Sequence, residues 1–143
     1  MLIKLLPEQV KEGWDVVRPM IVRTLPASLR VNAEAMSNIL SAILREKAQF
    51  WCYYRREGDG RPRGVCLTTF MFDHVAGLKY LLIYSLTALE PLSDQDYIEG
   101  LSVLKKYAEE NDCQEVIGYV EDDKFVRVLQ RIGGVKTTNL VRL

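Results

Sequence analysis

Residues 78–98 read LKYLLIYSLTALEPLSDQDYI, and this stretch decides the fold. Residues 78–89 are almost wholly apolar, which predicts a central strand that is covered on both faces. The following EPL ends that strand, and Ser93 with Asp96 has the form of a capping box, so a long helix is expected to begin there. A short strand is predicted next, at 115–120. A strand, a helix and a strand at this spacing indicate a right-handed crossover between two parallel strands.

Upstream of this stretch, two turn sequences predict an antiparallel meander. Residues 49–54 are rich in aromatic side chains, and residues 65–73 are rich in other strand-forming residues. The sequence GDG at 58–60 separates these two runs, which indicates a hairpin. The sequence AG at 76–77 makes a second tight turn into the apolar strand. Three consecutive antiparallel strands are therefore expected.

The N-terminal part is predicted to hold a short strand at 1–6 and then two helices. Pro7 opens the first helix, and Pro19 is expected to kink or end it. Asn32 can cap the second helix, whose apolar residues recur at helical spacing.

The C-terminal part predicts one more helix and one more strand. Residues 122–132 form an amphipathic pattern that two glycines close, and residues 135–143 read as a strand. The predicted order is thus strand, two helices, three antiparallel strands, long helix, strand, helix, strand. No repeat or linker interrupts it, so we expect a single domain over residues 1–143. Its class is α/β, with a mixed sheet of the α+β kind.

Periodicity also predicts which side chains are buried. The long helix should present one buried stripe, made of Tyr97, Ile98, Leu101, Leu104 and Tyr107. Nine residues should be largely buried in the core: Trp14, Met36, Ile39, Ile43, Phe70, Leu82, Leu101, Leu104 and Leu129.

Charge and composition argue against several classes of protein. Lysine plus arginine total 19 and aspartate plus glutamate total 19, so no net field attracts nucleic acid or an anionic membrane. No segment reaches the ~20 apolar residues of a membrane span. The three cysteines are far apart and His74 is the only histidine, so no metal site is expected. We expect reduced thiols in a protein that stays in the cytoplasm or is packaged in a particle.

The order of elements resembles that of the GNAT superfamily of acyl-CoA-dependent N-acyltransferases. The resemblance covers the whole chain. Its most specific local match is FVRVLQRIGGV at 125–135, which resembles the closing helix and glycine turn of that family. The same phrase is similar to the version found in small GNAT-like proteins of tailed phages. The resemblance implies acetyl-CoA or another acyl-CoA as donor, and an amine or protein partner as acceptor.

The resemblance also implies where CoA would bind. Main-chain groups of Ser85, Leu86 and Thr87 would hold the pantetheine arm along the central strand. The diphosphate would lie at the start of the long helix, at Ser93, Asp94 and Gln95. In the family this loop is rich in glycine, whereas residues 90–96 here contain no glycine and three carboxylates. A self-capped helix and a weakened diphosphate loop are therefore expected.

The catalytic residues that the resemblance implies are only partly present. Leu129 stands where many members of the family have a tyrosine, and residues 78–89 contain no acidic side chain. Tyr84 and Tyr119 are the candidates for the catalytic hydroxyl, and His74 is a further base in a surface turn. Three functions stay open: an atypical N-acyltransferase, a GNAT-fold binding or phage-particle component without catalysis, and an unrelated α/β binding module.

Overall fold

The structure is a computed structural model that describes residues 1–25, 32–119, 123–133 and 143. Within these residues the sheet has five strands in the order β1-β2-β3-β4-β5. Each of the first three neighbouring pairs is antiparallel, and β5 runs parallel to β4. The strands are β1 (Leu2–Lys4), β2 (Ala48–Tyr53), β3 (Gly64–Asp73), β4 (Leu78–Ala88) and β5 (Val116–Gly118).

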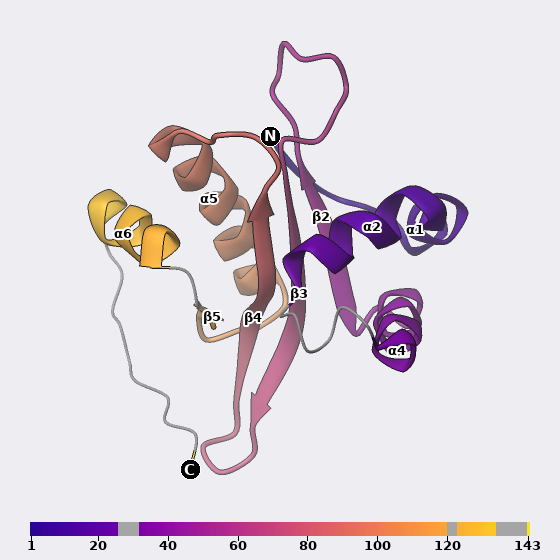
Figure 1. Cartoon of the computed structure of the whole chain (residues 1–143). Helices are drawn as coiled ribbons and strands as arrows, with labels where there is room; N and C mark the ends of the chain where they lie inside the picture. Colours follow the sequence, from indigo (N-terminus) through magenta and orange to yellow (C-terminus); the bar gives the residue numbers. More distant parts are fainter. Residues whose placement is uncertain (26–31, 120–122, 134–142) are drawn as a thin grey trace.

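Helices cover both faces of the sheet (Figure 1). The N-terminal helices lie on one face, and the two later helices lie on the other. The first group is α1 (Pro7–Glu12), α2 (Trp14–Thr24) and α4 (Ala33–Leu44), and the second is α5 (Asp94–Glu110) and α6 (Asp123–Ile132).

The predicted crossover is confirmed. Helix α5 joins β4 to β5, and these strands pair in parallel, with Leu82 opposite Ile117. The meander of β2, β3 and β4 is also confirmed. In the turn between β3 and β4, Asp73 Oδ1 accepts bonds from the N–H groups of Val75 and Ala76. The predicted last strand, at 135–143, lies outside the described residues except for its final residue.

The prediction that Pro19 could end a helix was wrong, because the break comes earlier. Helix α1 ends at Gly13, and α2 then runs through Pro19. The Gly13 N–H still bonds to the Gln9 carbonyl at 2.9 Å, and a Cβ at position 13 would meet that carbonyl oxygen at 3.1 Å. Pro19 cannot donate to the Asp15 carbonyl, but both residues are exposed, so water can satisfy that carbonyl.

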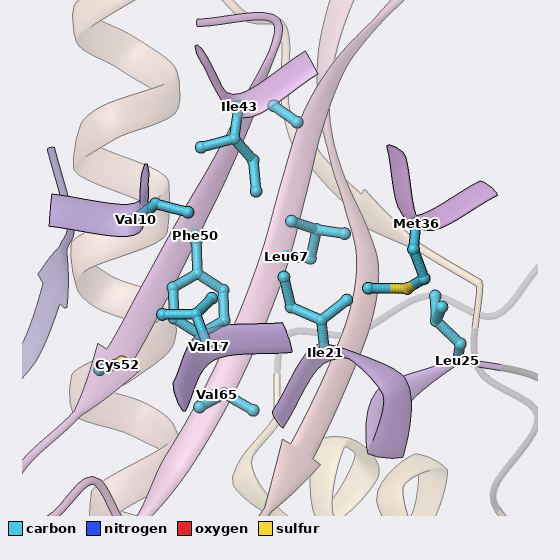
Figure 2. Close-up of a cluster of buried hydrophobic side chains, with 11 residues drawn as sticks. Val10, Val17, Ile21, Leu25, Met36, Ile43, Phe50, Cys52, Val65 and Leu67 are labelled. Carbon is cyan, nitrogen blue, oxygen red and sulfur yellow. The ribbon is translucent and has the colours of Figure 1, made fainter. Parts of the chain in front are cut away.

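The side chains between the sheet and the N-terminal helices form the larger apolar cluster (Figure 2). Successive β2 residues point to opposite faces, so Phe50 and Cys52 enter this cluster whereas Trp51 does not. Its buried members are Val10, Val17, Ile21, Leu25, Met36, Ile43, Ala48, Phe50, Cys52, Val65 and Leu67.

A second cluster lies between the sheet and α5, with Leu81 and Leu104 at its centre. Of the nine predicted core residues, four are buried: Met36, Ile43, Leu82 and Leu104. The other five, Trp14, Ile39, Phe70, Leu101 and Leu129, are only partly buried. The predicted stripe of α5 was wrong at Ile98, which is 42% exposed. Ala108, four residues after Leu104 and on the same face, is buried instead.

Of the helices in the described residues, none combines the length and the apolar character that a bilayer span requires.

Candidate functional site

Strand β4 carries a β-bulge at Tyr84. Leu67 of β3 pairs with Ser85, whereas the next β3 residue, Thr68, pairs with Ile83. Between these two pairs β4 therefore has one residue more than β3, and Tyr84 is that extra residue. Its side chain is 40% exposed, although both of its neighbours in sequence are buried.

The bulge changes which side chains of β4 face each layer of helices. Residues two apart in a regular strand point to the same face. Here Ile83 packs in the cluster under α5, while Ser85 bonds to Thr24 of α2 on the opposite face. After the bulge, Leu86 packs against the α5 cluster again. Bulges that redirect side chains in this way are common beside active sites.

Strands β4 and β5 part beside this bulge. Their last parallel pair is Ile83 with Gly118, whereas β4 continues to Ala88. Beyond that pair, the described part of β5 supplies no neighbour for β4. A strand edge of this kind has main-chain N–H and C=O groups that can bond an extended ligand. The residues predicted to hold the pantetheine arm lie on this segment: Ser85, Leu86 and Thr87.

The two candidate tyrosines directly follow the last parallel pair, Tyr84 within β4 and Tyr119 just after the end of β5. Tyr84 is 40% exposed and Tyr119 is 55% exposed. The Tyr119 hydroxyl contacts the sulfur of Met71 at 3.9 Å. Because Met71 pairs with Tyr80, this contact directs the Tyr119 hydroxyl toward the β3–β4 turn and away from residues 85–87. Tyr84 is therefore the candidate nearer to the open edge of β4.

The Ser85 hydroxyl ties β4 to the end of α2. Thr24 Oγ1 lies 2.8 Å from Ser85 Oγ and 2.7 Å from the Ile21 carbonyl oxygen. A hydroxyl has one hydrogen, so if Thr24 donates to Ile21, Ser85 donates to Thr24. Sequence analysis did not single out Thr24, because no local pattern shows that α2 ends over β4.

Helix α5 is capped by its own side chains, as the sequence predicted. Ser93 Oγ accepts from the Asp96 N–H at 3.2 Å, and Asp96 Oδ2 accepts from the Ser93 N–H at 2.8 Å. The second Asp96 oxygen accepts from the Tyr53 hydroxyl at 2.8 Å. Burial raises the pKa of Asp96, but the hydrogen bonds from Ser93 and Tyr53 outweigh burial and hold the pKa below its usual value. Asp96 is thus a structural anion at the positive end of α5.

Asp94, in the first turn of α5, is held by α6. Arg131 donates its Nε to Asp94 Oδ2 at 2.7 Å and its Nη2 to Oδ1 at 2.6 Å. This is a bidentate pair, and the hydrogen bond from Arg131 lowers the pKa of Asp94. The rings of Tyr97 and Phe125 join the same two helices, with centroids 5.6 Å apart. Sequence analysis missed the role of Arg131, whose only signal was its place in the last turn of a predicted helix.

The loop between β4 and α5 is closed by protein groups as well. The N–H groups of Leu89 and Glu90 both donate to the Arg63 carbonyl, at 2.8 and 3.2 Å. Pro91 has no N–H, and its carbonyl accepts from Arg55 Nη2 at 3.3 Å. The Arg63 guanidinium pairs with the Glu90 carboxylate. Two of the arginines beside the GDG turn, Arg55 and Arg63, therefore bind this loop.

Cys66 is the thiol nearest to the open edge, since it pairs with Leu86. Burial raises its pKa to about 12 and raises that of Cys52 to about 11, so both are protonated packing groups. His74 stacks on Phe72 in the exposed turn that joins β3 to β4, whereas Tyr84 lies six residues after the start of β4. No group of three metal-ligating side chains gathers within the part of the chain that the structure describes.

A small cavity lies beside this region, and a larger one lies away from it. An apolar cavity of about 40 Å³ lies between the sheet and α5, against Leu86, Thr87 and Phe125. It is too small for a drug-sized ligand. A larger cavity of about 260 Å³ opens beside Lys4 and Gln49, and no candidate site residue lines it. We therefore place the candidate site at the open edge of β4, where the strand geometry is irregular, and not at the larger cavity.

Comparison with known proteins places this geometry in a fold family. No protein-family model and no curated protein sequence matches this chain. Solved structures do match over its full length. A probable acetyltransferase is 13% identical, with a TM-score of 0.70 over 100% of this chain and 95% of that chain. The chain has the GNAT acetyltransferase fold.

Two further structures with this fold have named substrates or ligands. The ribosomal-protein-alanine N-acetyltransferase from Brucella melitensis biovar Abortus 2308 is 12% identical, with a TM-score of 0.63 over 100% of this chain and 99% of that one. The aminoglycoside N-acetyltransferase AAC(6')-Iy in complex with CoA is 13% identical, with a TM-score of 0.65 over 100% and 97%. The resemblance drawn from element order is thereby confirmed for the fold.

The GNAT resemblance places the CoA diphosphate at the start of α5, and the residues found there do not fit a diphosphate. A phosphate site at a helix start requires N–H groups that are free to donate, and a positive local field. Here the N–H groups of Ser93 and Asp96 are taken by the cap. Glu90, Asp94 and Asp96 also place three carboxylates around the loop.

Proposed function

We propose that this chain binds an acyl thioester along β4 residues 85–87 and transfers the acyl group to an amine. The observation that carries the proposal is the bulge at Tyr84, beside the point where β4 and β5 part. An extended pantetheine arm carries two amide groups, which can bond to an open strand edge as another strand would. In the transfer, the C–N bond forms, the C–S bond breaks, and the amine loses a proton as the sulfur gains one.

Tyr84 is the residue that we propose as proton donor to the leaving sulfur. It follows the last parallel pair, its side chain is 40% exposed, and it lies directly before residues 85–87. Tyr119 is the second candidate, although its hydroxyl contacts Met71 in the structure. The acceptors to try first are amines of the kinds named for the structural neighbours: aminoglycosides and the N-terminal amine of an alanine peptide.

Binding and turnover can be measured separately. Calorimetric titration with acetyl-CoA and with S-acetyl-pantetheine tests donor binding without an acceptor. Release of free thiol, followed with a panel of amines, tests transfer. Replacing Tyr84 with Phe removes only the hydroxyl, so we expect thiol release to slow by about 100-fold or more while donor affinity is kept. Tyr80→Phe is the matched control, because Tyr80 lies on β4 before the bulge and should leave both measurements unchanged.

A second function has its own supporting observation. The closed loop between β4 and α5 favours a GNAT-fold protein that binds a partner without catalysis, including a phage-particle component. Neither donor would then bind, and no amine would release thiol. Binding of either thioester, followed by thiol release that depends on Tyr84, would contradict this second function.

A further inference from the structure

We propose that this chain recognises its acyl donor through the acyl-pantetheine part alone. Pantetheine thioesters are then the donor class, and the nucleotide diphosphate of CoA adds no affinity. The inference rests on the proposed function and narrows its substrate class. It starts from the disagreement between the GNAT fold and the loop that precedes α5.

Four main-chain donors beside the loop are already used by the protein. Leu89 and Glu90 donate to the Arg63 carbonyl, and Ser93 and Asp96 donate to each other's side chains. Pro91 has no N–H to offer. A diphosphate would have to break these bonds before it could accept from the same groups, and each broken bond would leave a polar group to be satisfied again.

Two of the cations near the loop are also held by carboxylates. Arg131 gives two N–H groups to Asp94, at 2.6 and 2.7 Å, and Arg63 pairs with Glu90. A diphosphate could recruit Arg131 only by leaving Asp94 unpaired beside the new negative charge. Asp94 therefore occupies the position at the helix start that an anionic ligand would otherwise take.

Among the described residues, β5 pairs with β4 only up to Ile83, so a ligand at the open edge of β4 displaces no described β5 residue. This edge lies before the loop in sequence, and its segment 85–87 carries main-chain groups that need no charged partner. The part of the donor that this edge can bond is the amide-containing pantetheine arm. Within the described residues, the arm therefore meets a strand segment without a β5 neighbour, whereas the diphosphate would compete with bonds and ion pairs that the protein already makes.

The test compares two donors on the intact chain by calorimetric titration. We expect acetyl-CoA and S-acetyl-pantetheine to bind with dissociation constants within about threefold of each other. We also expect the acetyl-CoA affinity to be insensitive to salt, because no phosphate contact is screened. Acetyl-CoA binding that is more than about tenfold tighter would overturn the inference and leave the proposed function standing. Binding of neither donor would overturn both.

Three variants sharpen the comparison. Asp94→Asn frees Arg131 and removes a repelling charge, so acetyl-CoA should tighten by about threefold or more while S-acetyl-pantetheine stays unchanged. Asp112→Asn is the matched control at the other end of α5 and should change neither affinity. In the double variant Asp94→Asn, Arg131→Gln, which removes the paired charges together, the acetyl-CoA affinity should stay as in the parent. If that variant weakened acetyl-CoA by about tenfold and spared S-acetyl-pantetheine, Arg131 would be a phosphate ligand and the inference would be wrong. Circular dichroism confirms that each variant is folded before titration.

Discussion

Thr24 Oγ1 lies 2.8 Å from Ser85 Oγ, so the last residue of α2 is bonded to the first residue after the bulge in β4. Ser85 is 7% exposed, and Leu67 is its partner on β3. The bond connects the helix layer on one face of the sheet with the strand segment that we propose for donor binding. It fixes the position of that segment, because a bulge by itself leaves the extra residue without a ladder partner.

Replacing Thr24 with Val keeps the shape of the side chain and removes this bond. We expect a loss of about 1 to 2 kcal/mol in the free energy of unfolding, because the buried Ser85 hydroxyl loses its partner. Chemical denaturation measures the change, with Thr24→Ser as a control that keeps the hydroxyl. In the double variant with Ser85→Ala the two losses should not add. Additive losses would mean that the two hydroxyls do not interact.

The face through which α5 packs can be tested by truncating side chains that are buried to different degrees. Leu104 is 1% exposed, so Leu104→Ala should cost about 2 to 5 kcal/mol. Ile98 is 42% exposed, so Ile98→Ala should stay within about 1 kcal/mol of the parent. Leu101→Ala should fall between them, because Leu101 is only partly buried. An Ile98 variant as unstable as the Leu104 variant would show that the helix packs through a different face.

Acid should weaken the contact between α5 and α6. The hydrogen bond from Arg131 holds the pKa of Asp94 below its usual value. The ionised carboxylate therefore contributes to the free energy of unfolding above the unfolded pKa of about 3.9. That contribution is lost as pH falls through the lower folded pKa. We expect the parent to melt above Asp94→Asn at pH 7, and the two melting temperatures to converge below about pH 4. Asp112→Asn controls for the loss of an exposed carboxylate. A gap of constant size from pH 7 to acid would exclude ionisation of Asp94 as its cause.

The three cysteines should differ in reactivity. Cys52 and Cys66 are buried, and burial raises their pKa values to about 11 and about 12. Only the thiolate reacts with a disulfide reagent, so at pH 8 we expect Cys113 alone to react in the folded protein. All three should react in denaturant. Rapid reaction of Cys66 in the native state would show that β3 opens beside Leu86.

The sequence predicted the crossover because its signals are local. The apolar run of β4 is one continuous stretch, and Ser93 and Asp96 are three residues apart. Such patterns can be recognised in the sequence before the fold is known. The break at Gly13 in place of Pro19 shows the limit of such signals. A proline inside a helix removes one hydrogen bond and crowds the carbonyl four residues before it, and whether the helix continues depends on how the packed structure accommodates that carbonyl.

From local patterns alone, the sequence predicted the order of the described elements apart from the break at Gly13, the mixed sheet and the self-capped start of α5. The bulge at Tyr84, the bond from Thr24 to Ser85 and the pairing of Arg131 with Asp94 come from tertiary packing. The last two join residues that are 61 and 37 positions apart in the chain. No spacing rule relates side chains at such separations, because the path of the folded chain decides which of them meet. The sequence shows the charged residues at the start of α5, but it does not show which residues pair with them.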